Sequence, residues 1–86
     1  YNLLKLDTAT GRVWQVQYRL GGTDSMTVAI DNSSLLWDGE IERAGRFELY
    51  ATNNMYQFIL LDTATGRTWQ VQWNTEPSRR FRERIY

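Results

Sequence analysis

The chain has 86 residues, 42% hydrophobic and 14% aromatic, so we expect one domain over 1–86 with a thin core. Its ten basic and ten acidic residues balance, so no net charge attracts nucleic acid or anionic membranes. The sequence has no Cys and no His, which excludes disulfides, Cys nucleophiles, His bases and His/Cys zinc sites and leaves the compartment open. No apolar run approaches the roughly 20 residues that span a bilayer.

One stretch occurs twice. Residues 2–18 and 57–73 are identical at 11 of 17 positions when aligned at an offset of 55. Repetition at a fixed offset predicts a repeated supersecondary unit. We therefore divide the chain into repeat 1 (about 1–31), a connector (32–45) and repeat 2 (about 46–86).

The first copy of the repeated stretch is expected to be a β-hairpin. Asp7 can accept hydrogen bonds from the turn amides, and Gly11 supplies positive φ in a three-residue loop with a G1 bulge. That loop pairs Leu6 with Trp14. The register places Leu4, Leu6, Trp14, Val16 and Tyr18 on the core face and Lys5, Asp7, Gln15 and Gln17 on the other.

In the rest of repeat 1 and in the connector, turn-forming residues indicate where strands begin and end. A turn at 19–24 precedes an alternating strand at 25–31, which completes a three-stranded meander. In the connector, Asp38-Gly39 predicts a small hairpin, while Glu40–Ala44 fits one helical turn equally well. We expect three connector residues to tuck beneath it: Leu36, Trp37 and Ile41.

Repeat 2 is expected to hold four strands, because one more alternating segment precedes its hairpin. Asp62 and Gly66 take the turn roles of Asp7 and Gly11. The expected strands are 46–51, 55–62, 67–74 and 79–86. The pattern places Ile59, Leu61, Trp69, Val71 and Trp73 on the core face and Phe58, Leu60, Thr68, Gln70 and Gln72 on the other.

A lone hairpin is marginally stable in water, so the two units are expected to bury their Trp-bearing faces against each other. The sequence therefore predicts an all-β fold. The expected form is an antiparallel meander duplicated with pseudo-twofold symmetry, as a sandwich or a partly open barrel.

The repeated Leu-Asp-Thr-Ala-Thr-Gly-Arg-x-Trp-Gln-Val-Gln sequence, with Gly45–Tyr50 and Asn54–Phe58 before its second copy, resembles a group of small uncharacterised bacterial β proteins. The resemblance covers most of residues 2–73. It implies a repeated β meander, no established activity and no functional residues. The Asp-x-x-Thr-Gly-x-x-Trp pattern also resembles blades of quinoprotein-type β-propellers, which typically need four or more blades; that resemblance concerns turn chemistry and no cofactor site.

The repeated glutamines are the first candidate binding residues. Neither turn geometry nor packing explains identical outward amides in both copies. They can form a polar platform that hydrogen-bonds an extended partner or a glycan. Alternatively, they are neutral residues on a solvated face, copied by duplication. The residues are Gln15, Gln17, Gln70 and Gln72.

Aromatic residues are the second candidates, because exposed rings stack on sugar faces. Trp37 in the connector and Trp73 near a strand end are the tryptophans expected to be exposed. Trp14 and Trp69 are expected to pack in the core.

Two charged clusters complete the candidates. Alternating arginines in 79–86 fit a single-stranded nucleic-acid groove, or equally the protection of an exposed edge strand. Carboxylates in 38–48 fit solvated loops, a glycosidase pair or a weak Ca²⁺ site without an EF-hand pattern. The residues are Arg79, Arg80, Arg82 and Arg84, and Asp38, Glu40, Glu42 and Glu48.

No catalytic constellation, metal site or cofactor motif emerges. We therefore expect a non-enzymatic module for protein–protein interaction or self-association. The alternatives are a carbohydrate-binding module using exposed aromatic residues and a single-stranded nucleic-acid binder using the C-terminal Arg strand.

Overall fold

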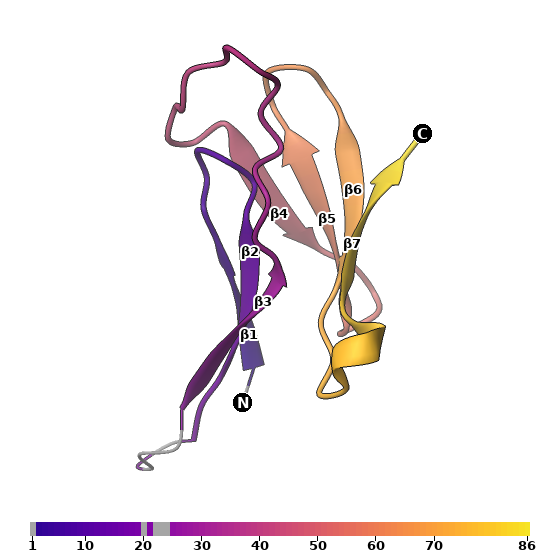
Figure 1. Ribbon diagram of the computed structural model, residues 1–86. Coiled ribbons are helices and arrows are strands. Elements are labelled where there is room, and N and C mark those ends of the chain that lie inside the picture. The colour runs from indigo at the N-terminus through magenta and orange to yellow at the C-terminus, as the bar shows by residue number, and fades with distance from the viewer. Residues whose placement is uncertain (1, 20, 22–24) are drawn as a thin grey trace.

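The computed structural model describes residues 2–19, 21 and 25–86 and shows two antiparallel sheets (Figure 1). The first has the strand order β1-β2-β3 and the second β4-β5-β6-β7. The sandwich-like all-β fold predicted from the sequence is thus confirmed. The strands are β1 (Asn2–Leu6), β2 (Val13–Gln17), β3 (Met26–Asp31), β4 (Phe47–Ala51), β5 (Gln57–Asp62), β6 (Thr68–Gln72) and β7 (Phe81–Ile85).

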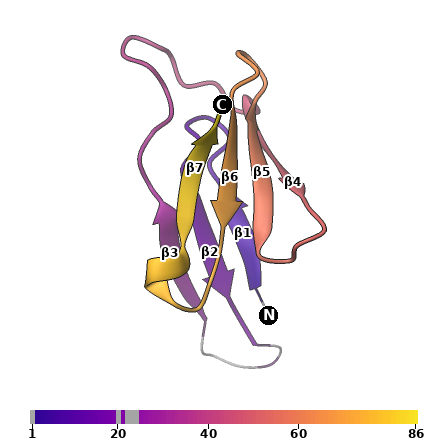
Figure 2. The same ribbon diagram turned by 90° about the vertical axis from the view of Figure 1, so that its right-hand side faces the viewer.

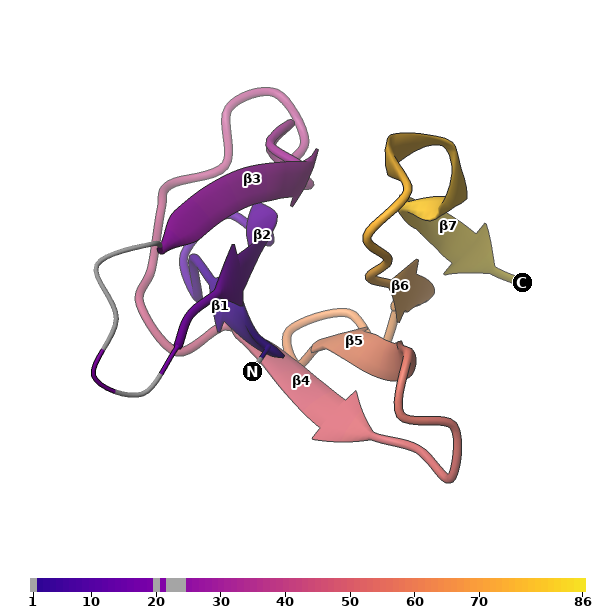
Figure 3. The same ribbon diagram turned by 90° about the horizontal axis from the view of Figure 1, so that it is seen from below.

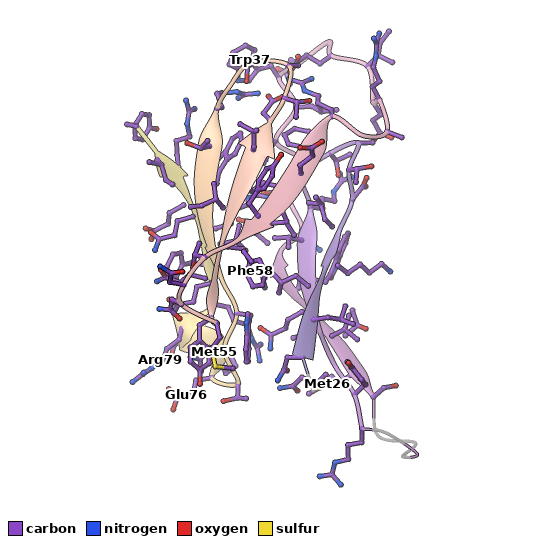
Figure 4. The ribbon with its side chains drawn as sticks, turned by 180° about the vertical axis from the view of Figure 1, so that it is seen from behind. Met26, Trp37, Met55, Phe58, Glu76 and Arg79 are labelled. Carbon is purple, nitrogen blue, oxygen red and sulfur yellow. The ribbon has the colours of Figure 1, made fainter. Side chains whose placement is uncertain are left out.

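The two sheets form separate layers that face each other (Figures 2 and 3). Apolar side chains from both layers meet between them, and Phe58 projects into this space (Figure 4). The connector crosses from β3 in one layer to β4 in the other. The buried core consists of Val13, Phe47, Leu60, Trp69 and Val71.

Both repeated turns close a four-residue loop, one residue longer than expected. Asp7 N donates to Arg12 O (2.9 Å), and Gly11 N donates to Asp7 O (2.9 Å). Gly11 has φ 79°, and its counterpart Gly66 has φ 77°, the left-handed conformation that glycine adopts without strain.

The longer loop shifts the predicted register of the first hairpin by one residue. Leu6 pairs with Val13, so the predicted pairing of Leu6 with Trp14 is wrong. Because side chains alternate along a strand, this shift exchanges the two faces of β2. Val13 and Gln15 are buried toward the second sheet, whereas Trp14 and Val16 project from the outer side.

The second hairpin has the same register, displaced by 55 positions: Leu4 pairs with Gln15, and Ile59 pairs with Gln70. Trp69 and Val71 lie in the core as predicted. Leu60 pairs with Trp69 and lies on the same, core-facing side of the sheet. The prediction that Leu61 faces the core and Leu60 faces away from it is therefore wrong. The same correction applies to Phe58, which packs on the core, and to Ile59, which faces out.

Equivalent residues of the two repeats therefore face in opposite directions. Trp69 points between the sheets, but its counterpart Trp14 points outward; Gln15 points between the sheets, but its counterpart Gln70 points outward. The two Trp-bearing faces do not meet. Since a twofold axis would bring equivalent faces together, this arrangement departs from the expected pseudo-twofold symmetry.

The connector forms neither the hairpin nor the helical turn considered from the sequence. A tight turn closes when Glu40 N donates to Trp37 O (3.1 Å), with Gly39 at φ 83°. Leu36 is half-buried against the core, but Trp37 and Ile41 are exposed, which corrects their predicted burial beneath the connector. The turn predicted at 19–24 lies largely outside the described residues.

Candidate functional site

Gln15 is a buried link between the two sheets, which corrects its prediction as an outward binding residue. Its side chain is 0% exposed. Nε2 donates to Asn74 O (2.9 Å), and Oε1 accepts from Asn74 N (3.2 Å). The amide nitrogen and the amide oxygen of Gln15 are thus both hydrogen-bonded to the backbone of Asn74, which follows β6.

The four glutamines do not form one platform. Gln17 lies on the same side of its sheet as Gln15, whereas Gln70 and Gln72 lie on the outer side of the second sheet. Gln72 accepts from Gln57 Nε2 (3.0 Å) and donates to Arg79 O (2.9 Å). The Gln70 side chain makes no hydrogen bond with any described residue.

Around Gln70 lies a sheet face that mixes apolar and polar side chains and that we call the outer Gln face. Tyr50 is 48% exposed and Ile85 is 41% exposed on it. The Tyr50 hydroxyl donates to Glu48, which raises the pKa of Tyr50. Within the strands, the face consists of Glu48, Tyr50, Gln57, Ile59, Leu61, Thr68, Gln70, Gln72, Phe81, Glu83 and Ile85.

The first sheet has a corresponding outer Trp face on its far side. Lys5 Nζ lies 5.6 Å from the centroid of the Trp14 ring, and Leu3 beside it is exposed. The prediction placed Trp14 in the core because the expected three-residue loop paired it with Leu6, on the apolar face. The face consists of Leu3, Lys5, Trp14, Val16, Thr27 and Ala29.

The two tryptophans predicted to be exposed differ. Trp37 is 61% exposed and lies on the connector, with the Arg67 Cζ atom 4.1 Å from its ring centroid (Figure 4). Trp73 is 7% exposed, and its Nε1 donates to Met55 O (2.9 Å) beneath the ring of Tyr56. The prediction for Trp73 is therefore wrong: the β6 end is covered by the loop that precedes β5.

The arginines of the last strand are mostly engaged with the protein itself. The Arg82 side chain is 4% exposed and donates to Gly11 O (2.8 Å) and Ser33 O (3.1 Å) across the two sheets. It also pairs with Asp31 (3.4 Å). Burial lowers the pKa of Arg82, and Asp31 partly opposes this effect. Arg82 fastens β7 to the first repeat, so it is not part of an open strip of phosphate-binding groups.

A buried ion cluster supports the second turn. Asp62 accepts from Arg46 Nε and Nη2 (both 2.9 Å) and from Arg67 Nη2 (3.0 Å). Burial alone raises the pKa of Asp62, but hydrogen bonds from Arg46, Thr65 and the Ala64 amide outweigh it and hold that pKa far below its ordinary value. Its counterpart Asp7 is a simpler turn residue, whose pKa is lowered chiefly by the hydrogen bond from Ala9 N (2.9 Å).

An open depression of about 530 Å³ lies beside this cluster. Arg46 on its wall already binds Asp62 and also Glu40 (2.9 Å), so its charge is satisfied. Glu40 likewise accepts from Trp37 N (2.7 Å). Among the described residues, no three candidate metal ligands gather. The lining residues are Gly39, Glu40, Ile41, Arg43, Ala44, Gly45, Arg46, Thr63 and Ala64.

Comparison with known proteins adds no family or fold neighbour, because no family model, curated protein or solved structure matches the chain. The only helical element in the described part of the chain is the single 3-10 turn Pro77–Arg79, and it cannot cross a membrane.

Proposed function

We propose that this protein is an interaction module that binds a protein partner through the outer Gln face. The single observation that carries the proposal is the composition of this face. Tyr50, Ile59, Leu61 and Ile85 present apolar surface on a regular four-stranded sheet, and Gln70 lies among them with an amide that bonds to none of the described residues.

The physical argument is desolvation. Aromatic and aliphatic side chains on one flat face gain free energy when a partner removes water from them. A half-buried amide specifies the partner, because covering it without a hydrogen bond is costly.

Photo-crosslinking tests the proposal. We replace Tyr50 by benzoylphenylalanine, which has a similar ring, and irradiate the chain both purified and in a lysate of its source cells. We expect a protein adduct that is lost when Gln70→Lys is added on the same face. Benzoylphenylalanine in place of Glu42, exposed on the connector, is the matched control. Absence of an adduct at position 50, or equal adducts at position 42, contradicts the proposal.

Exposure of Trp37 supports contact with a glycan as a second candidate function. With Trp73 buried, this site has one ring and the neighbouring Arg67. Titration with soluble glycans should change the tryptophan fluorescence of the native chain and not that of Trp37→Leu. An equal change in both contradicts this candidate.

A further inference from the structure

The packing between the two repeats is a heterologous interface, in which different faces of equivalent units meet. The strand pairings of the units match: Val16 pairs with Thr27, and Val71, 55 positions later, pairs with Arg82. The side of repeat 1 that carries Gln15 packs on the side of repeat 2 that carries Trp69. In a heterologous interface each unit contributes only one of the two contacting faces, so each unit keeps an equivalent of the other face on its opposite side.

Each half therefore recurs, unoccupied, on the outside of the molecule. The outer Gln face is the repeat 2 equivalent of the buried side that carries Gln15. The outer Trp face is the repeat 1 equivalent of the buried side that carries Trp69. The two outer faces repeat part of the two faces already packed together, with Trp14 for Trp69 and Val16 for Val71, while Lys5 stands where repeat 2 has the buried Leu60.

We propose that a second copy of this chain stacks head to tail, its outer Trp face on the outer Gln face of the first. The proposal rests on the proposed function and names its partner. It continues an interface that already exists within the chain. Because the contact is heterologous, successive copies form a ring if the rotation closes and a filament if it does not.

The equivalence also names a specific hydrogen-bonded pair. Within the chain, the Gln15 amide binds the backbone of Asn74. Gln70 occupies the position of Gln15, and Arg19 occupies that of Asn74, again 55 positions apart. The Gln70 amide, unpaired in one copy, then binds the backbone N–H and C=O of Arg19 in the next.

The charges on the two faces are complementary. Glu48 and Glu83 are the charged side chains that point outward from the strands of the outer Gln face, and Lys5 is the one on the outer Trp face. Opposite charges favour the encounter of the two faces. Raising the salt concentration from 50 to 500 mM should therefore weaken association several-fold.

The contact between copies is expected to be weaker than the one within the chain. Thr27 stands where repeat 2 has Arg82, so the bonds from Arg82 to Gly11 and Ser33 are not repeated. The described first sheet also has no strand equivalent to β4, which supplies Phe47 to the internal core. Association should therefore depend on protein concentration.

Two blocking variants test the arrangement. Gln70→Lys blocks the outer Gln face, and Val16→Lys blocks the outer Trp face. Every head-to-tail contact needs one intact face of each kind. We therefore expect wild-type oligomers that grow with concentration, each variant monomeric on its own, and a one-to-one heterodimer when the two are mixed. Native mass spectrometry with one variant ¹⁵N-labelled identifies the heterodimer, and circular dichroism checks the fold. If a variant misfolds, Tyr50→Lys or Leu3→Lys replaces it on the same face.

The other outcomes overturn the inference and separate it from the proposed function. Self-association of Val16→Lys alone means that two outer Gln faces meet each other, which refutes head-to-tail stacking. A wild-type chain that stays monomeric up to about 1 mM, the Kd of a contact worth only about 4 kcal/mol, also refutes it. In that case a crosslink from position 50 to a different protein keeps the proposed function, and the absence of any crosslink removes both.

Discussion

Single residues of identical type have different roles in the two repeats. Gln15 is sealed between the sheets with both amide atoms bonded to Asn74, whereas Gln70 makes no hydrogen bond with the described residues. Removing a buried hydrogen-bonding group leaves its partner unsatisfied, while removing a half-exposed one does not.

This contrast gives a direct prediction. Gln15→Leu should lower the free energy of unfolding by about 1–3 kcal/mol, because the Asn74 amide loses its acceptor. Gln70→Leu should change it by less than about 0.5 kcal/mol, as expected of a surface change. Urea denaturation at low protein concentration measures both, and equal losses contradict the assignment of buried and outer faces.

Asp62 and Asp7 also have different roles, although each accepts a hydrogen bond from a backbone N–H of its turn. Asp62→Asn removes the charge that Arg46 and Arg67 share, and breaking a buried ion pair costs about 3 kcal/mol or more. Asp7→Asn is the matched control and should cost about 1 kcal/mol or less, because its described contacts are turn hydrogen bonds.

The pH dependence has a definite sign. The pKa of Asp62 is lowered in the folded chain, so its contribution to stability is complete above the unfolded value of about 3.9 and is lost as the pH falls below it. Thermal unfolding between pH 6 and pH 2 should show a steeper loss for the wild type than for Asp62→Asn. Parallel curves would show that Asp62 is not the ionised partner of the two arginines.

At the scale of the element, the two turns have the same sequence and different surroundings. A Cβ added to Gly11 would lie 2.5 Å from Leu35 Cδ1, whereas one added to Gly66 meets nothing within 4 Å. Both positions have positive φ, which costs an L-residue roughly 1–2 kcal/mol.

Gly66→Ala should therefore lose about 1 kcal/mol of stability from backbone strain alone. Gly11→Ala should lose roughly 1–3 kcal/mol more, because Leu35 must move out of its packed position. Chemical denaturation of both variants measures the difference, and a Leu35→Ala background should reduce it. Equal losses of stability in the two variants would mean that the Leu35 side chain can move away from the new methyl group without an energetic cost.

The sequence predicted the strands well and the pairing of the hairpins incorrectly. Alternation, glycine and asparagine located strands and turns, since these signals are local. The register depended on a three-residue loop and on placing Trp14 inside with Leu6. The four-residue loop pairs Leu6 with Val13 instead.

At the scale of the whole molecule, Arg82 joins parts of the chain that are far apart in sequence. Its guanidinium spans from β7 to the first turn and to the end of β3. Arg82→Met should lower the free energy of unfolding by about 2–4 kcal/mol, because two carbonyls and Asp31 lose a charged donor. Arg84→Met, in which an exposed arginine is lost, should cost less than about 1 kcal/mol. Differential scanning calorimetry compares the variants, and similar shifts in Tm would contradict this role of Arg82.

The direction in which each repeat faces was not predicted from the sequence, because the predicted register of the hairpins was wrong by one residue. Trp-Gln-Val-Gln is identical in both copies, yet Trp is inside in one copy and Gln in the other. Those four residues cannot encode two opposite results, but residues around them differ: Lys5 stands where repeat 2 has the buried Leu60, and the buried Val13 stands where repeat 2 has Thr68. These differences can be interpreted only once the register is known, and the three-residue loop assumed for the hairpin gave the wrong register. The sequence therefore indicated the layers and not which sides of them meet.

The unequal surroundings of Gly11 and Gly66 also bear on how the duplicated gene segment can change over time. The two turns have the same sequence, but only the first has a neighbour packed against its glycine. Natural variants should accumulate substitutions such as Asn, which tolerates positive φ, at the second turn before the first.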